Sequence, residues 1–123
     1  MIRFIHCMKR KQGISTEAFR RFWNSAEFND LVDEMLSHAL TSSVRKSLTL
    51  DIEFNRALQA ERGAKQPFDG VLEIVWQSGA DIAALLDNQE VERLTRELEE
   101  IQSRYIDFTE SRRFFTEYED DRL

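Results

Sequence analysis

The chain has 123 residues, which is enough for one domain with a buried core and too few for two. Hydrophobic residues make up 41% and charged residues 33%, a composition typical of a globular protein rather than a disordered one. The formal net charge of −6 argues against nucleic acid as a partner, because a phosphate backbone is bound by a surplus of Lys and Arg.

The cysteine and histidine content excludes several further classes. The single cysteine, Cys7, rules out an internal disulfide and suits a reducing compartment. No segment has the length needed to cross a bilayer, and the pattern of a secretory signal is missing, so we expect a cytoplasmic protein without membrane contact. Two His and one Cys show no ligand spacing, and there is no phosphate loop or nucleotide motif. We therefore expect neither a metal nor a cofactor.

The first elements follow from hydrophobic periodicity. Residues 2–8 predict a central strand, because this run is apolar on both parities. Ser15 can accept a hydrogen bond from the first turn of a helix. Past Glu27 the apolar stripe of this helix changes phase, which predicts a break between Glu27 and Asp30, with Asn29 or Asp30 capping a second segment. The apolar positions before the break are Phe19, Phe22, Trp23 and Ala26.

The middle of the chain combines an alternating segment with a long polar one. Residues 40–50 alternate with period two and have one much more polar side, as in an edge strand. Residues 51–67 are a polar connection whose few apolar positions permit a short amphipathic helix lying over the domain. A connection of this length is more often a functional flap than a plain link, and we hypothesise that it covers a cavity mouth. A surface excursion without such a role is the alternative.

The last third supplies the elements that complete one domain. We predict a strand over residues 71–76, a helix opened by Ser78 and interrupted at Asp87-Asn88, a longer amphipathic helix, and a strand over residues 111–118. Residues 1–118 thus form a single domain, followed by an acidic tail over residues 119–123.

This order of elements predicts the fold class. Strand, helix, strand, strand, helix, strand is the order of an α+β, ferredoxin-like βαββαβ sandwich with both helical layers on one face of an antiparallel sheet. The opposite face then has no cover within the chain, and a second copy is the simplest lid. Two sheets packed face to face would enclose a cavity for a small ligand.

Three sequence blocks resemble the EthD family, in the family's order and over nearly the whole chain. The resemblance implies the dimeric α-β barrel fold, a homodimer, and a cavity for small organic molecules, often in catabolic or aromatic-polyketide settings. In one place the chain departs from the family, which usually has a His four residues after the helix Trp, where this chain has Glu27. The blocks are Lys9 to Ser15 with Glu17, Phe19, Phe22 and Trp23; Pro67 to Glu73, which contains a Phe-Asp-Gly motif; and Tyr105 to Asp107 with Arg113 to Glu117.

Two residues are candidates for proton transfer. Glu73 is a carboxylate within an apolar strand, where it either acts as a general acid or base of raised pKa or pairs with a cation at a dimer interface. His6 lies in the first strand, which neighbours the third strand in this topology. We therefore expect that His6 and Glu73 approach each other as a catalytic pair. A satisfied core histidine is the alternative for His6.

Four further residues are candidates for ligand binding: Trp23 and Tyr105 as core or cavity wall, Glu27 in place of the family's His, and Asp69, for which a turn-capping role before Gly70 competes. The function that follows is a cofactor-independent enzyme for oxygenation, isomerisation or dehydration of a small aromatic or cyclic compound. The alternatives are a non-catalytic binding or accessory protein of the same fold, and a stress or assembly protein. Fold analogy alone does not choose among them.

Overall fold

The computed structural model describes residues 1–38 and 41–119, without the side chain of residue 42. Within these residues one antiparallel sheet has the strand order β2-β3-β1-β4. The strands are β1 (Ile2–Met8), β2 (Thr41–Leu48), β3 (Gly70–Trp76) and β4 (Arg112–Glu117). This confirms the predicted antiparallel sheet with the first and third strands at its centre and the second at an edge. Of the predicted acidic tail, residues 120–123 lie outside the described part, as does residue 40 of the predicted second strand.

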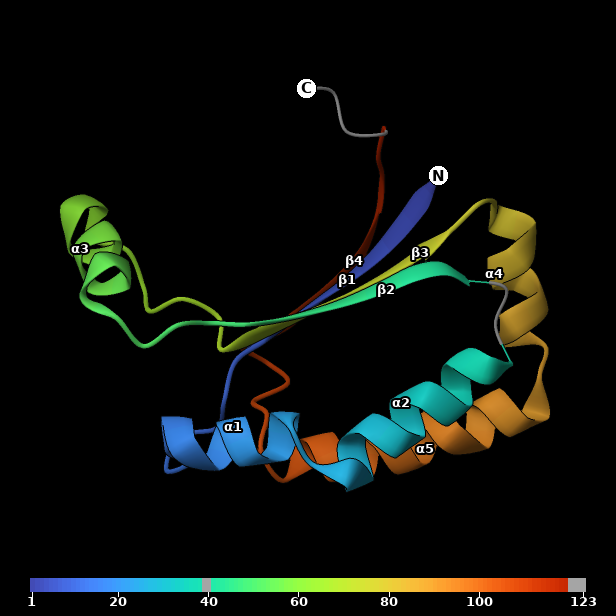
Figure 1. Ribbon diagram of the computed structural model, residues 1–123, viewed down its shortest axis with the longest axis horizontal. Coiled ribbons are helices and arrows are strands. Elements are labelled where there is room, and N and C mark those ends of the chain that lie inside the picture. The colour runs from blue at the N-terminus through green and yellow to red at the C-terminus, as the bar shows by residue number, and fades with distance from the viewer. Residues whose placement is uncertain (39–40, 120–123) are drawn as a thin grey trace.

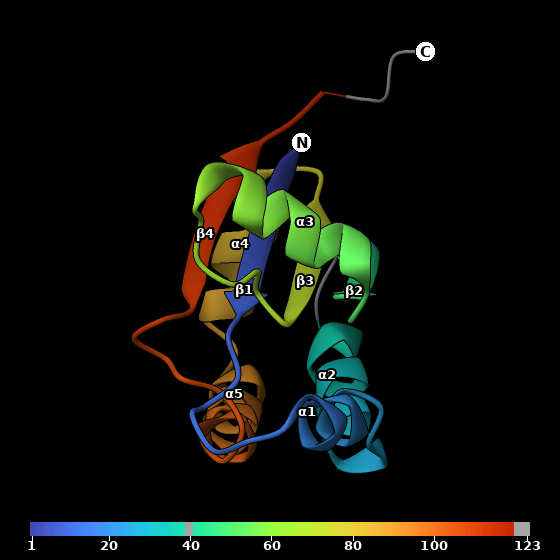
Figure 2. The ribbon, with the colours of Figure 1, turned by 90° about the vertical axis from the view of Figure 1, so that its left-hand side faces the viewer.

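Helices cover one face of the sheet. α1 (Thr16–Trp23), α2 (Ala26–Ser37) and α5 (Gln89–Ser103) lie below the sheet in Figure 1 and again in the view of Figure 2. α4 (Gly79–Leu86) lies at one end of the sheet. α3 (Glu53–Arg62) lies beyond the other end, on the side away from α1, α2 and α5. The helical layer therefore lies on one face, as the sequence predicts. No helix of the described part is long and apolar enough to span a membrane.

The break in the first helical region lies earlier than predicted. α1 ends at Trp23 and α2 begins at Ala26, so the break is at Asn24-Ser25 instead of between Glu27 and Asp30. Ser25 caps α2, since its side chain accepts from the backbone N–H of Phe28 at 3.2 Å. The break at Asp87-Asn88 is confirmed.

The core lies between the sheet and α1, α2 and α5. Trp23 is buried there, and Gly70 lies so close to its ring that an added Cβ would be 2.6 Å from Trp23 Cζ3. Lys46 reaches into the same layer from β2, donating to the carbonyl of Trp23 at 3.0 Å and to Asn29 Oδ1. Its ammonium also lies 5.0 Å from the centroid of the Trp23 ring. Burial lowers the pKa of Lys46.

The register decides which residues face the helices. His6 of β1 lies opposite Leu72 of β3, whereas Glu73 lies opposite Ile5. Successive side chains of a strand point to opposite faces, so His6 faces the helices and Glu73 faces away from them. We call the face without the helical layer the open face; it carries Ile5, Glu73 and Phe114.

Candidate functional site

A cavity of about 240 Å³ lies between the sheet and the C-terminal part of α5. His6 of β1 and Arg113 of β4 reach it from directly opposite positions on neighbouring strands. We call it the His6 cavity; its lining is His6, Glu99, Gln102, Phe108, Ser111 and Arg113. Within the described residues the buried polar side chains are His6, Gln102 and Ser111, with 6%, 5% and 9% of their surface exposed, and all three line this cavity. Three buried polar side chains therefore lie at one cavity, while the buried Nε of Arg3 and Nε1 of Trp76 lie outside it.

The His6 imidazole is kept neutral. Burial, helped by the positive charge of Arg113, lowers the pKa of His6 to about 4. Among residues 1–38 and 41–119, none forms a hydrogen bond with its ring, which contacts Phe4 at a centroid distance of 6.3 Å. A neutral imidazole has one nitrogen that donates and one that accepts. His6 therefore offers both functions to a molecule in the cavity.

The two other buried polar side chains have different roles. Ser111 holds the wall, since its hydroxyl donates to the carbonyl of Asp107 at 2.7 Å and accepts from the backbone N–H of Lys9 at 2.9 Å. The amide of Gln102, in contrast, has no hydrogen-bond partner in the described part of the chain. Because Gln102 lines the cavity, water or a ligand there can hydrogen-bond to its amide. The Gln102 amide and the His6 ring are thus the groups left for a ligand.

The rest of the lining carries charge and an aromatic ring. Arg113 is exposed, and its guanidinium lies 3.8 Å from the carboxylate of Glu99 on α5. Phe108, in the turn between α5 and β4, is also exposed. A cation and an aromatic ring beside a neutral imidazole suit a planar organic molecule with a polar or anionic group.

The expected pairing of His6 with Glu73 is wrong. The two side chains lie on opposite faces, because the register pairs residue 6 with residue 72. Glu73 lies on the open face, opposite Ile5 of β1 and Arg45 of β2. Burial, with a smaller contribution from the negative charge of Glu73, raises the pKa of Cys7 on the same face. The cavity also differs from the predicted one, since it lies on the helix side within one chain and not between two sheets.

None of the four predicted ligand-binding residues lines the His6 cavity; Asp69 lines a second pocket, and the other three lie in the helical layer. Trp23 is a core residue beneath β3, and the half-buried ring of Tyr105 stacks on Phe22 at a centroid distance of 4.7 Å. Glu27 is exposed in the first turn of α2, where its carboxylate lies 3.5 Å from the guanidinium of Arg104. All three contribute to packing or to the surface of the helical layer.

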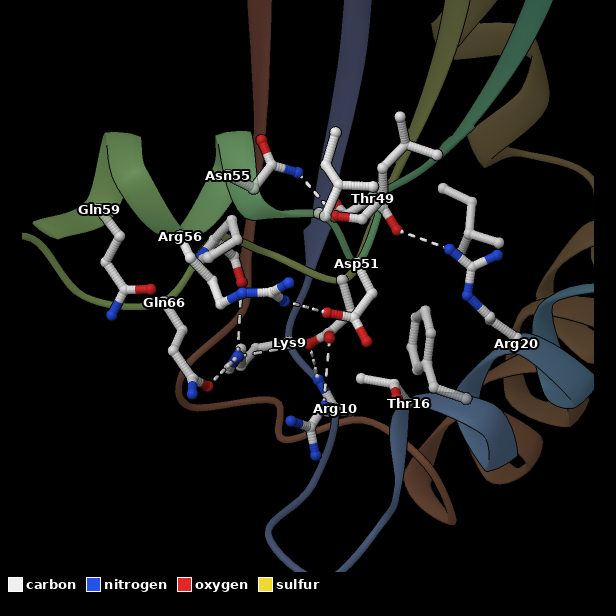
Figure 3. Close-up of a pocket in the computed structure, with 16 residues that line it drawn as sticks. Lys9, Arg10, Thr16, Arg20, Thr49, Asp51, Asn55, Arg56, Gln59 and Gln66 are labelled. Carbon is white, nitrogen blue, oxygen red and sulfur yellow. Dashed lines mark hydrogen bonds and ion pairs between the residues drawn. The ribbon is translucent and has the colours of Figure 1, made fainter.

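A second pocket, of about 200 Å³, lies between α3, α1 and the ends of β1 and β2 (Figure 3). We call it the arm pocket. Asp69 fastens its floor: the carboxylate accepts from the backbone N–H of Arg10 at 2.8 Å and from Arg10 Nε at 3.2 Å, and it lies 3.5 Å from Lys9 Nζ. The carboxylate of Asp69 thus joins the segment before Gly70 to the end of β1, and its printed contacts are with Lys9 and Arg10 and not within its own turn.

The side chains of the arm pocket satisfy one another. Arg20 donates to the carbonyl of Thr49 at 3.0 Å, and Arg56 pairs with Asp51 at 2.7 Å. Lys9 Nζ donates to Gln66 at 3.1 Å. The pocket lies under the polar connection predicted to be a flap, but α3 borders this pocket and does not reach the His6 cavity. Compared with the His6 cavity, it offers few groups without a partner.

Within the described residues, no cluster of three or more His, Cys, Asp and Glu side chains could hold a metal ion. Apart from His6, one residue of the His6 cavity could have been found from the sequence, namely Gln102. It follows Leu98 by four positions on the apolar stripe of α5, where a polar residue is unexpected. Ser111 had no such signal, because its burial depends on the turn after α5.

Comparison with known proteins places the fold. The chain matches no protein-family model and no curated protein. It is similar in structure to At3g17210 from Arabidopsis thaliana, with a TM-score of 0.60 and 10% identity over all of both chains. It is also similar to HapK from Hahella chejuensis, with a TM-score of 0.54 and 15% identity over all of this chain and 97% of the other. Both solved structures share the architecture of this chain over its full length.

The chain has the dimeric α-β barrel fold. At 10% and 15% identity, the likeness shows the architecture and no activity. The resemblance to the EthD family remains a prediction from the sequence.

Proposed function

We propose that this chain is an EthD-like protein that binds a small organic compound in the His6 cavity. One observation carries the proposal: the buried polar side chains converge on one cavity, and two of them, His6 and Gln102, have no hydrogen-bond partner in the described part of the chain. Both groups line the cavity, so their hydrogen-bonding atoms are available to a molecule there. A ligand that hydrogen-bonds to both would be held by two side chains that the fold fixes in place.

The lining indicates the class of compound. An imidazole and an amide together offer donors and acceptors at fixed positions, which suits a hydroxyl or carbonyl group. Phe108 suits an aromatic or cyclic ring. The volume of about 240 Å³ lies below the range of about 300–1,000 Å³ usual for drug-sized ligands, so we expect a compound smaller than a typical drug.

Cofactor-independent catalysis in this cavity is the second candidate, and the position of Arg113 favours it. With a pKa of about 4, His6 is a weak base until a bound anion raises that pKa. It could then take a proton from a bound hydroxyl or activated C–H group, and the resulting anion would lie beside the Arg113 guanidinium. Pairing of Arg113 with that anion would remove one of the two causes that lower the pKa of His6. Such a step can begin an isomerisation, a dehydration or an oxygenation in catabolism or secondary metabolism.

Dimerisation through the open face completes the proposal. The fold closes by packing two sheets together, and the open face carries apolar side chains such as Ile5 and Phe114. In this arrangement Glu73 serves the interface between copies, where a cation such as Arg45 of β2 is its cross-strand neighbour.

NMR titration with phenol and with benzoate tests ligand binding. We expect the His6 ring and Gln102 side-chain amide signals to move in the wild type, and Gln102→Leu to weaken binding at least tenfold. The matched control is Gln59→Leu in the arm pocket, which should bind like the wild type. Equal effects of the two variants, or shifts confined to arm-pocket signals, would contradict the proposal.

Native mass spectrometry of freshly purified protein then separates binding from catalysis. A retained small molecule can be identified and tested for turnover with the wild type and with His6→Asn and Glu73→Gln. Catalysis predicts that His6→Asn abolishes turnover, while Glu73→Gln, on the opposite face, retains it. Unchanged turnover in His6→Asn would leave only the binding role.

A further inference from the structure

α3 presents its polar side to its own chain and its apolar side outward. Asn55, Arg56 and Gln59 point from α3 toward the arm pocket (Figure 3). Phe54 and Leu58 are on the opposite side of the helix, because a helix turns by 100° per residue. They are 79% and 64% exposed. A helix on the surface of a lone domain has the reverse arrangement, with its apolar stripe turned to the core.

The helix also has little support within the chain. None of its residues is buried, and its N-cap residue, Ile52, gives no side-chain cap. It is held at its base by Arg56, which pairs with Asp51, and by Asn55, which donates to the carbonyl of Leu50 at 2.7 Å. Isolated helices shorter than about 12–15 residues are marginal in water, so packing of an apolar side is what stabilises them. The apolar side of α3 is therefore the part of this helix that needs a partner.

We propose that the apolar side of α3, formed by Phe54, Ala57 and Leu58, packs against the second copy of the chain in the homodimer. α3 lies past the end of the sheet on the side of the open face, away from α1, α2 and α5 (Figures 1 and 2). A copy that covers the open face is thus already next to α3, and no further partner is needed. By two-fold symmetry, α3 of each chain then packs against the other copy.

This inference rests on the homodimer proposed above and adds to it a contact that sheet packing alone does not supply. The inner side of α3 borders the arm pocket in the single chain. Contact with the second copy would hold α3 in that position over the pocket. The contact of apolar side chains explains why a segment that is otherwise polar keeps Phe54 and Leu58 exposed in the single chain.

Site-specific photocrosslinking tests the contact directly. A p-benzoylphenylalanine at position 54 should give a covalent dimer on irradiation of the dimeric protein. The same probe at position 59, on the inner side of α3, should give no covalent dimer. A covalent dimer from position 54 but not 59 is the supporting result. Crosslinks only within one chain, or equal yields at both positions, would overturn the proposal.

Sedimentation velocity separates the contact made by α3 from dimerisation as such. Phe54→Ser with Leu58→Ser should weaken dimerisation at least tenfold, whereas Leu86→Ser, equally exposed at 77% on α4, should leave it unchanged. Circular dichroism checks that the variants fold. If the wild type is a dimer and the double variant dimerises with the same affinity, the contact made by α3 is refuted and the homodimer is not. A wild type that is monomeric at every concentration refutes both.

Discussion

His6 and Arg113 lie directly opposite each other on β1 and β4, and both side chains reach the same cavity. Burial of His6 and the positive charge of the Arg113 guanidinium together lower the pKa of His6 to about 4. The imidazole is thus neutral at physiological pH and takes a proton only in a distinctly acidic solution.

The first prediction concerns stability in acid. The unfolded chain takes up a proton at His6 near the ordinary pKa of 6.5, while the folded chain does so only near about 4. As pH falls from 6.5 toward 4, the unfolded state binds more protons, so the free energy of unfolding decreases, by about 3 kcal/mol at most from this residue. Urea denaturation of the wild type and of His6→Asn across this range measures it. An equal loss in both would show that His6 is not responsible.

The second prediction concerns Arg113 itself. Arg113→Gln removes the positive charge opposite His6, so the pKa of His6 should rise. It should stay below 6.5, because burial is the larger of the two causes. Proton NMR titration of the His6 ring gives the value, with Arg112→Gln on the same strand as the control. A His6 pKa that is unchanged or lower in Arg113→Gln would contradict the assigned cause.

The third prediction concerns the approach of Gly70 to Trp23. Gly70→Ala places a Cβ 2.6 Å from the ring of a buried tryptophan, so the ring or the strand must shift. We expect a loss of roughly 1–3 kcal/mol in the free energy of unfolding. Gly79→Ala is the matched control, because its Cβ would be 3.9 Å from Ile2 Cδ1, an ordinary contact. Equal stability of the two variants in chemical denaturation would show that the core adapts.

The fourth prediction concerns Lys46. Lys46→Met keeps the aliphatic stem but removes the ammonium that donates to Trp23 O and Asn29 Oδ1. Because these acceptors are partly buried, we expect a loss of about 1–3 kcal/mol in the free energy of unfolding. Arg21→Met, an exposed cation on α1, should change stability by less than about 0.5 kcal/mol. A loss in Arg21→Met as large as in Lys46→Met would assign the effect to net charge.

The sequence predicted the elements well where periodicity alone decides them. β1 and β3 are apolar on both parities because both are central, and the alternation over residues 40–50 identified an edge strand. The helix break was misplaced because Asn29 and Ser25 can both cap. In the structure Ser25 takes this role, and Asn29 donates its side-chain amide to the carbonyl of Trp23 instead.

The site was less predictable, because it depends on register. β1 and β3 pair residue 6 with residue 72, so residues of equal parity share a face. A shift of one residue would have brought His6 and Glu73 to the same face, and nothing in the composition of either strand excludes that shift. For α3, the apolar spacing of Phe54 and Leu58 predicts an amphipathic helix but not the side on which the domain lies. The expected helix over the domain therefore has its apolar side turned outward.

The Phe-Asp-Gly motif, the most specific part of the EthD resemblance, has a structural explanation. The carbonyl of Phe68 accepts from Thr49 Oγ1, Asp69 fastens Arg10, and Gly70 makes room for Trp23. Each residue joins two segments that are distant in the sequence, and none of the three lines the His6 cavity. In this chain the motif therefore ties the scaffold together outside the His6 cavity, so a change in that cavity's lining need not disturb the three contacts that join these segments.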